Sequence, residues 1–389
     1  MPLIIKIILI ASYALTGFYI LYILYSYIGI KRLKAHKLKK DEDLPNLTVI
    51  VCAKDEENCI EDCIRSIYAQ DYPKEKYSLI VVNDRSEDRT SEILKTLQEE
   101  LSFMTLLEIN ECPAGISPKK NAISIAMEIC KTEFIVATDA DATHHSKWLR
   151  SYGSLCDNEL GASTGLSIFS KKEFRSKWEE IWQKMQTLES LSHNVIIAGA
   201  MMNGFVITAN GNNMLYRKDL FKNKNTLRTD IVSGDDMDII LEAQKQNYKI
   251  VFNSHPASVV TLIPENSISD VINQRVRWAS KTLKATSSVI IFGLSVFIFY
   301  LLTILLPFLA IIDTAVLPYW CGILIIKAIC DFFYMIVSMK KFGISFKFKH
   351  LFMMEVFHSL FVVWIGLYGT FGTFTWKGAS YKKTLKDNK

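Results

Sequence analysis

Four long apolar blocks constrain what this chain can fold into more than any other feature. They cover residues 3–30, 289–312, 316–339 and 351–375, and half of the 389 residues are hydrophobic. A helix needs about 20 predominantly apolar residues to span the hydrocarbon core of a bilayer, and each block approaches that length. The sequence therefore predicts a multi-pass membrane protein with one amino-terminal and about three carboxyl-terminal transmembrane helices.

The first block ends at a basic stretch, KRLKAHKLKK, at residues 31–40. No small-residue cleavage site follows it, which favours a retained anchor over residues 1–30 rather than a signal peptide that is removed. Lysine and arginine accumulate on the cytoplasmic side of a membrane. We therefore expect residues 31–45 to be a cytoplasmic linker, with the soluble part on the same side of a plasma or inner membrane.

The carboxyl-terminal region, residues 287–376, poses a conflict of topology. With the soluble part inside, four complete spans place the tail of residues 377–389 outside, yet this tail is rich in lysine, which favours the cytoplasm. One carboxyl-terminal segment is thus expected to be re-entrant or interfacial. The spacing of Gly366, Gly369 and Gly372 points to the last one.

The middle of these three blocks carries two opposite charges, Lys327 and Asp331. Residues four apart lie on the same face of a helix, so we expect the two side chains to form an ion pair within it.

The eight cysteines carry no metal-binding pattern. None forms a CxxC pair, and Cys59 and Cys63 have no matching second half. This pattern argues against a zinc site and fits a reduced, cytoplasmic domain.

Residues 46–267 read as a soluble α/β domain. Short apolar strands are predicted at residues 47–52, 79–82 and 105–109 and in FIVATDADA, and polar turns and helical patterns alternate with them. Such alternation predicts a mainly parallel sheet covered by helices. Ligands of such sheets bind beyond the carboxyl ends of the strands.

Acidic residues gather at those predicted strand ends. Asp55 and Glu56 follow the first strand, Asp84 follows the second, and Asp139 and Asp141 close FIVATDADA. Two carboxylates separated by one residue can hold a divalent cation, Mg²⁺ or Mn²⁺, that leaves coordination positions open for diphosphate oxygens. The alternative is a solvated turn whose acids cap a helix.

Glycine-rich phosphate loops are missing from the sequence. It contains no GxxxxGK[ST] motif, and no GxGxxG follows the first strand. A diphosphate would therefore need a metal and side chains. Lys119 and Lys120, in SPKKNAI, are candidates, although a solvated basic helix start explains them equally well.

These features together resemble the membrane-bound family 2 glycosyltransferases of the GT-A fold, which include cellulose, chitin and hyaluronan synthases, with ceramide glucosyltransferases close by. The motifs that carry the resemblance occur in order between residues 47 and 278: AKDEEN, VNDRSEDRT, PKKNA, TDADA, GNNM, SGDD and QRVRW. The resemblance implies a GT-A domain, a Rossmann-like α/β fold, that transfers a sugar from a UDP-sugar with a divalent metal.

The resemblance also implies roles for individual residues. Glu56 and Asp84 would contact the uracil and ribose of the donor, and Lys119 would lie near the nucleotide. Asp139 and Asp141 would hold the metal, with Asp141 as the more direct ligand. The remaining residues of the donor and acceptor sites are Asp55 on the donor side, where the family often has Asn, and Gly211, Asn212 and Asn213 on the acceptor side. The chain has NDRS where the family often has DDGS.

SGDDMDI supplies the proposed catalytic base. The acidic pair of the family aligns with Asp235 and Asp236, which gives the base role to Asp236, with Asp235 as the fallback. An inverting transfer needs one carboxylate that deprotonates the acceptor hydroxyl as the hydroxyl attacks C1. The alternative is a helix start rich in acids, which the helix dipole favours in any case.

QRVRW lies in a predicted interfacial helix over residues 268–286. On a helix, Gln274, Arg277 and Trp278 share one face. That face is expected to bind substrate: Arg277 the donor diphosphate, Trp278 an acceptor sugar ring, and Gln274 the acceptor. Arg275 projects elsewhere and is expected to belong to a basic collar at the membrane surface.

The predicted function is an inverting sugar transfer from a UDP-sugar to a polysaccharide or lipid-linked glycan at the bilayer. The alternatives are a single-addition glycolipid glucosyltransferase, a non-catalytic scaffold of a glycan-synthesis complex and a nucleotide-binding sensor. A homo-oligomer or a glycan-export partner is compatible with the sequence, and no nucleic-acid partner is expected.

Overall fold

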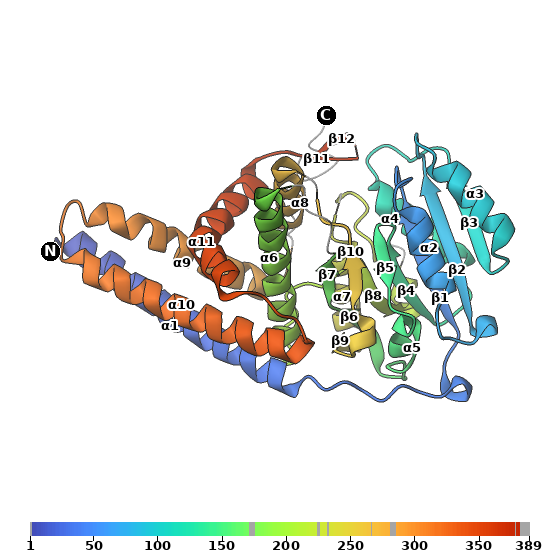
Figure 1. Cartoon of the computed structure of the whole chain (residues 1–389), viewed down its shortest axis with the longest axis horizontal. Helices are drawn as coiled ribbons and strands as arrows, with labels where there is room; N and C mark the ends of the chain where they lie inside the picture. Colours follow the sequence, from blue (N-terminus) through green and yellow to red (C-terminus); the bar gives the residue numbers. More distant parts are fainter. Residues whose placement is uncertain are drawn as a thin grey trace. The chain divides into compact units, whose positions relative to one another are not determined.

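The computed structural model describes residues 2–170, 176–223, 226–231, 233–265, 267–280, 285–377 and 379–381. The chain divides into two compact units (Figure 1). A helical unit comprises Met1–Arg32, Phe174–Asn203 and Asn266–Phe374, and an α/β unit comprises Leu33–Glu173, Gly204–Glu265 and Thr375–Lys389.

A mixed sheet forms the centre of the α/β unit. Among the described residues it has seven strands in the order β3-β2-β1-β4-β8-β6-β9. The strands β3, β2, β1 and β4 run parallel, whereas β8 is antiparallel to both of its neighbours, β4 and β6. The mainly parallel sheet expected from the sequence is therefore confirmed. The strand bounds are β1 Leu47–Ala53, β2 Tyr77–Asp84, β3 Met104–Ile109, β4 Phe134–Asp139, β6 Leu160–Gly165, β8 Asn213–Arg217 and β9 Lys249–Asn253.

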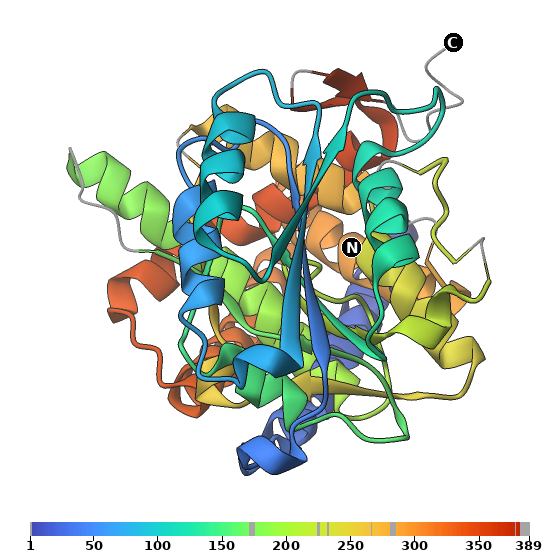
Figure 2. The same ribbon diagram turned by 90° about the vertical axis from the view of Figure 1, so that its right-hand side faces the viewer.

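Helices cover both faces of this sheet. Figure 2 shows α2 (Ile60–Tyr68) and α3 (Thr90–Glu100) on one side of the strands and α4 (Pro118–Ile129) on the other. Four side chains of α2 recur three or four residues apart and are fully buried, which fixes the face that packs on the sheet: Ile60, Cys63, Ile64 and Ile67. The unit also contains α5 (Trp148–Gly153), α7 (Asp235–Lys245), a small sheet of β5 (Ala142–His144), β10 (Val260–Leu262) and β7 (Ser167–Phe169), and short 3-10 turns at Asp41–Asp43, Lys74–Lys76, Lys218–Phe221 and Pro256–Ser258.

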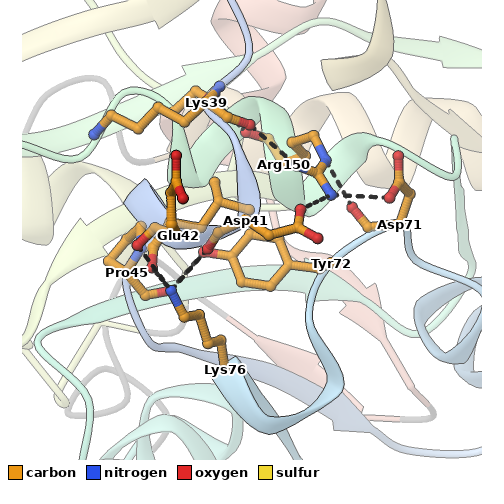
Figure 3. Close-up of polar contacts among 10 residues, drawn as sticks. Lys39, Asp41, Glu42, Pro45, Asp71, Tyr72, Lys76 and Arg150 are labelled. Carbon is orange, nitrogen blue, oxygen red and sulfur yellow. Dashed lines mark hydrogen bonds and ion pairs between the residues drawn. The ribbon is translucent and has the colours of Figure 1, made fainter.

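The linker that follows the first helix is fastened to the α/β unit by polar contacts (Figure 3). The Arg150 guanidinium donates to the carboxylates of Asp41 and Asp71, at 2.6 and 2.9 Å. The Lys76 ammonium donates to the main-chain oxygens of Asp41, Glu42 and Leu44, at 2.7, 3.1 and 3.0 Å. These contacts give the basic linker a defined path over its last residues.

Within the part of the chain that the structure describes, four helices are long and apolar enough to cross a membrane, and all four belong to the helical unit: α1 (Leu3–Arg32), α9 (Ser287–Leu309), α10 (Val316–Phe342) and α11 (Phe348–Phe371). They match the four apolar blocks of the sequence. In Figure 1, α1 and α10 lie side by side, whereas α6 (Lys177–Met201) and α11 run across their direction. The unit also contains α8 (Ile268–Ser280). Two short strands come after α11 in the chain, namely β11 (Phe374–Trp376) and β12 (Ala379–Tyr381).

The sequence assigned residues 46–267 to one domain, but α6, which lies within this range, belongs to the helical unit. The structure groups α6 with the membrane helices because α1 and α6 approach closely at two glycines. A Cβ atom on Gly29 would lie 1.8 Å from the carbonyl oxygen of Gly199, and one on Gly199 would lie 2.4 Å from that of Ser26. Small residues permit such close helix packing in membranes.

We predict that Gly29→Ala destabilises the helical unit by about 1–3 kcal/mol, because the new methyl group collides with the main chain of α6. The control is Gly17→Ala, also in α1, where a Cβ meets no atom within 4 Å. There the better helix propensity of alanine is expected to leave stability equal or slightly higher. Thermal unfolding in detergent measures both, and equal unfolding temperatures for the two variants would contradict the prediction.

The glycines near the end of α11 have a similar packing role. Cβ atoms on Gly366 and Gly369 would lie 2.9 Å from the Phe297 ring and 2.6 Å from the Ala279 side chain, respectively. They allow α9 and α8 to approach α11, which is one continuous helix up to Phe371.

The ion pair predicted inside α10 is confirmed, and it belongs to a larger cluster of polar side chains. The Lys327 ammonium lies 2.7 Å from the Asp331 carboxylate and 2.6 Å from the carboxylate of Glu355 in α11. Tyr19 of α1 donates to Asp331, and its hydroxyl lies 3.5 Å from that of Tyr300 in α9. One polar cluster thus connects α1, α9, α10 and α11.

Candidate active site

Acidic side chains meet at the carboxyl ends of three neighbouring strands in the α/β unit. Since β1 lies between β2 and β4, the loops that follow these strands are neighbours. They carry Asp55 and Glu56 after β1, Asp84 at the end of β2, and Asp139 and Asp141 at and after the end of β4. The strand order thus brings together the acids that the sequence singled out.

The loops after β1 and β2 hold each other in place. The main-chain N–H of Asp55 donates to the Ser86 hydroxyl at 3.0 Å, and the N–H of Glu87 donates to the Asp55 carboxylate at 2.7 Å. The N–H of Glu56 donates to the Thr90 hydroxyl at 2.8 Å. Asp55 therefore holds the loop after β2, in addition to the donor contact predicted for it.

Lys119, in the first turn of α4, connects the acids after β4 with those at the start of α7. Its ammonium lies 2.8 Å from the Asp139 carboxylate and 3.5 Å from the Asp235 carboxylate. Burial lowers the pKa of Lys119, but Asp139 and Asp235 raise it by more, so the side chain stays protonated. A fixed positive charge therefore lies between two groups of acids.

The neighbouring Lys120 has a different environment. It is fully buried, and its ammonium donates to the Asp238 carboxylate at 2.7 Å and to the main-chain oxygen of Arg228 at 3.0 Å. Asp238 also pairs with the Arg228 guanidinium. These contacts fix the start of α7, so of the two lysines singled out only Lys119 reaches the acids after β4.

Asp235 and Asp236 begin α7, directly after Gly234, which has a φ of +89°. The side chain of Asp236 is buried and accepts a hydrogen bond from the Thr208 hydroxyl at 3.5 Å. A Cβ atom on Gly211 would lie 3.4 Å from an Asp235 carboxylate oxygen and 3.5 Å from the Cβ of Asp236. The GNNM and SGDD segments therefore approach each other closely at Gly211.

The side chains of Asn212 and Asn213 in GNNM form hydrogen bonds within the fold. Asn213 is fully buried, and its side-chain oxygen accepts from Trp148 and Tyr152 while its amide donates to the main-chain oxygens of Leu166 and Ser258. These four bonds use the whole hydrogen-bonding capacity of an asparagine side chain. The acceptor contact predicted for Asn213 is therefore wrong. The side-chain oxygen of Asn212 accepts from the Ser167 hydroxyl at 2.7 Å.

QRVRW lies on α8 in the helical unit, whereas the other candidate residues lie in the α/β unit. Arg275 is buried, lies 2.5 Å from the Glu189 carboxylate of α6, and stacks over the Trp278 ring at 4.4 Å. Its predicted place in a surface collar is therefore wrong, because this ion pair draws the side chain inward. Gln274 accepts a hydrogen bond from Arg275, and Trp278 also stacks against His193. Arg277, on the same helix, is half-buried.

Sequence reasoning missed Lys377, which follows β11. Its ammonium donates to the Glu56 carboxylate at 2.7 Å and to the main-chain oxygen of Asp55 at 3.1 Å. The motifs of the sequence end at QRVRW, and no local pattern connects two residues 321 positions apart. A lysine after the last apolar block was the only signal.

The acids after β4 fit a divalent cation. Asp139 and Asp141 offer hard oxygen ligands, as Mg²⁺ and Mn²⁺ require. Burial, together with the nearby carboxylates of Asp139 and Glu56, raises the pKa of Asp141 to about 7. Among the described residues no group of three or more His, Cys, Asp or Glu side chains surrounds one point. Two protein carboxylates leave coordination positions for diphosphate and water.

The raised pKa of Asp141 predicts pH-dependent metal binding. A metal needs the ionised carboxylate, so protons compete with Mn²⁺ below a pH of about 7. We expect the apparent affinity for Mn²⁺ to be about tenfold lower at pH 6 than at pH 8, as measured by calorimetry. In the metal-free protein, this raised pKa favours the protonated folded state, so the Asp141 contribution to stability falls as the pH rises from about 4 to 7.

The control for this prediction is Asp141→Asn, which removes the titrating group. Its residual Mn²⁺ binding is expected to lose most of this pH dependence. Equal affinities of the wild-type protein at pH 6 and pH 8 would contradict the assignment.

The sequence of the chain matches a known protein family over the region that carries this site. Residues 45–281, more than half of the chain, match the sequence profile described as glycosyltransferase-like family 2. The chain belongs to this family. The family predicted from the motifs, and with it the class of enzyme, is thereby confirmed.

Individual members of the glycosyltransferase families resemble the chain more distantly. The poly-beta-1,6-N-acetyl-D-glucosamine synthase of Staphylococcus aureus is 24% identical over 241 residues, which cover 61% of this chain and 55% of the synthase. The synthase of the same name from Staphylococcus epidermidis is 24% identical over 263 residues, with coverages of 66% and 60%. The chain thus matches somewhat more than half the length of these relatives.

A solved structure supports the fold. The mannosyltransferase PcManGT of Pyrobaculum calidifontis, determined with GDP-Man and Mn²⁺, superimposes with a TM-score of 0.56 at 17% identity, over 93% of this chain and 98% of the mannosyltransferase. The α/β unit of this family 2 glycosyltransferase therefore has the predicted GT-A fold, joined to one amino-terminal and three carboxyl-terminal apolar helices.

Proposed function

We propose that this protein is a membrane-bound, inverting hexosyltransferase that transfers a sugar from a UDP-sugar to a lipid-linked glycan or growing polysaccharide. The observation that carries the proposal is the bridge of Lys119 between Asp139 and Asp235. This ammonium lies between a predicted metal ligand and the acid next to the predicted base, Asp236, in a position that suits a donor diphosphate, which needs positive charge. The names of the staphylococcal synthases support a sugar polymer as product and N-acetylglucosamine as the first sugar to test.

In this proposal each end of the site has a separate task. Glu56 and Asp84 bind the uridine, and Lys119 binds the diphosphate, so that it exchanges Asp139 for phosphate oxygens when the donor arrives. Asp139 and Asp141 hold Mg²⁺ or Mn²⁺. The bound metal neutralises charge on the departing diphosphate. The Mn²⁺ in the mannosyltransferase structure supports this choice of cation.

Asp236 acts as the base on the opposite side of the sugar. Its carboxylate removes the proton of the acceptor hydroxyl while the hydroxyl oxygen forms a bond to C1 and the bond from C1 to the diphosphate breaks. Gly211 lies beside this acid and, having no side chain, leaves space for the acceptor. Arg277 and Trp278 of α8 remain proposed contacts of the diphosphate and the acceptor, respectively.

The last helix is proposed to lie at the membrane surface rather than across it. In Figure 1 α11 runs across the direction of α1 and α10, whereas helices that span a bilayer together mostly pack at shallow crossing angles. Lys377, six residues after α11, contacts Glu56 in the α/β unit. An interfacial α11 would leave the lysine-rich tail on the side of the catalytic domain, in the cytoplasm, and would resolve the topology conflict.

A donor panel on the full-length protein in detergent tests the proposed function. UDP-N-acetylglucosamine, UDP-glucose, UDP-galactose and GDP-mannose are each supplied with Mn²⁺ and a membrane lipid extract, and release of the nucleoside diphosphate is measured. We expect release from one UDP-sugar that stops on addition of a chelator. Release of GDP from GDP-mannose alone would refute a UDP-sugar as the donor. Binding of UDP without release of a nucleoside diphosphate from any of the sugars would favour a scaffold or sensor.

The size of the product decides between extension and single addition. Radiolabelled donor should give a ladder if the enzyme extends a polymer and one band if it adds a single sugar. The similarity to polymer synthases favours the ladder. A single lipid-soluble band would favour the glycolipid alternative.

A further inference from the structure

Arg85, directly after β2, has an unusual conformation beside one of the proposed donor contacts. Its φ is +54°, a left-handed conformation that residues other than glycine rarely adopt. This backbone turns the side chain back onto the preceding residue. The guanidinium Nε and one terminal nitrogen donate to the two carboxylate oxygens of Asp84, at 2.7 and 3.2 Å.

The ion pair with Asp84 does not by itself account for the conformation of Arg85. A left-handed conformation is unfavourable for a residue other than glycine. A partly exposed ion pair stabilises a fold only weakly, and the Arg85 side chain is 32% exposed. Strained backbone that the surroundings maintain is typical of functional sites.

The loop around Arg85 is held firmly enough to maintain that strain. The Ser86 hydroxyl donates to the Asn83 side chain at 2.5 Å, and the Asn83 amide donates to the Glu108 carboxylate at 2.7 Å. Asp55 accepts the N–H of Glu87 from the neighbouring loop. The guanidinium and the Asp84 carboxylate are therefore presented as one pre-organised pair.

We propose that Arg85 and Asp84 together recognise the uracil ring of the donor, which makes Arg85 a determinant of nucleotide specificity. This inference rests on the proposed UDP-sugar donor. In the pair, hydrogen-bond donors lie beside an acceptor. Uracil presents the complementary groups, a carbonyl oxygen next to the N3–H. Asp84 accepts from N3–H while Arg85 donates to the adjacent carbonyl oxygen.

Other bases match this pair less well. A cytosine ring in the same placement as uracil has no hydrogen on N3 for Asp84 and turns an amino group toward Arg85 where uracil has its C4 carbonyl, so both contacts become unfavourable. Guanine shares the order of carbonyl and N–H but is a larger, two-ring base. A site that hydrogen-bonds its ligand discriminates strongly because a mismatched ligand leaves polar groups unpaired.

Calorimetric binding of UDP, CDP and GDP to the full-length protein in detergent with Mn²⁺ tests the inference. We compare wild type with Arg85→Gly, which suits the left-handed backbone, and Arg85→Lys, which keeps the charge but loses the planar donor fork. Arg85→Gly should weaken UDP binding about tenfold, the equivalent of roughly 1.4 kcal/mol, and narrow the difference between the UDP and CDP affinities, while Asp84 retains part of the preference. Arg85→Lys should recover part of the UDP affinity and little of the discrimination.

Thermal unfolding without nucleotide provides the structural readout. Arg85→Gly should unfold at the same or a higher temperature than wild type, because the strain is relieved. If Arg85→Gly keeps both the UDP affinity and the preference over CDP, Arg85 does not read the base and the inference is overturned. A wild-type protein that binds none of the three nucleotides, or prefers GDP, overturns the proposed UDP donor and this inference with it.

Discussion

Asp236→Asn is expected to lower kcat by a factor of about 10² to 10⁴, the usual contribution of a general base, while the dissociation constant of the UDP-sugar stays within about twofold. An amide cannot accept the proton of the acceptor hydroxyl, but it has nearly the same size as the carboxylate. The side chain is buried beside Thr208, so an isosteric change should leave the fold intact. Initial rates with saturating donor and acceptor, together with calorimetric donor binding, measure the two effects separately.

Asp235→Asn is the matched comparison, because the adjacent acid in the same turn has a different partner. Asp235 lies 3.5 Å from the Lys119 ammonium, so its loss should alter the position of Lys119 and change donor affinity more than Asp236→Asn does. If instead Asp235→Asn abolishes transfer with normal donor binding and Asp236→Asn is nearly active, the base is Asp235. Near-normal transfer by both variants would refute a base in this motif.

The sequence was sufficient to predict the sheet and the grouping of acids at one of its edges, because both follow from local patterns. Alternation of apolar strands with helices determines a parallel sheet, and acids after successive strands must meet at one edge of it. Asp84 and Asp139 lie at the ends of β2 and β4 for this reason. The four apolar helices were likewise recognisable because spanning a bilayer requires length and apolarity alone.

Other features could not be predicted because they depend on contacts between distant segments. Lys119 and Lys120 are adjacent in one motif, yet the rotation of α4 on the sheet directs one toward Asp139 and the other toward Asp238. Asn213 belongs to a motif expected to bind the acceptor, but hydrogen bonds within the fold use its side-chain amide fully. No residue near Asp55 in the sequence reveals that Lys377 will contact it.

Lys327→Met is expected to destabilise the helical unit by about 3–5 kcal/mol, the usual result of removing one partner from a buried charge cluster. The Lys327 side chain has no exposed surface and lies between the carboxyl groups of Asp331 and Glu355. Methionine has a similar length and is apolar, so packing changes little, whereas the two acids lose the ammonium that compensates them in an apolar surrounding. Thermal unfolding in detergent, followed by tryptophan fluorescence, measures the loss.

Two further variants distinguish this electrostatic effect from a general effect of substituting lysine in α10. Lys340→Met makes the same chemical change at an exposed position near the end of the same helix, and it should shift the unfolding temperature by little. Lys327→Met combined with Asp331→Leu and Glu355→Leu removes the whole charge cluster and should recover most of the lost stability, since replacing a complete buried ionic group by apolar residues is often neutral. If Lys327→Met unfolds at the same temperature as Lys340→Met, the cluster does not hold α10 and α11 together. If the triple variant is less stable than Lys327→Met alone, the polar contacts that Tyr19 makes to Asp331 matter more than the compensation of charge.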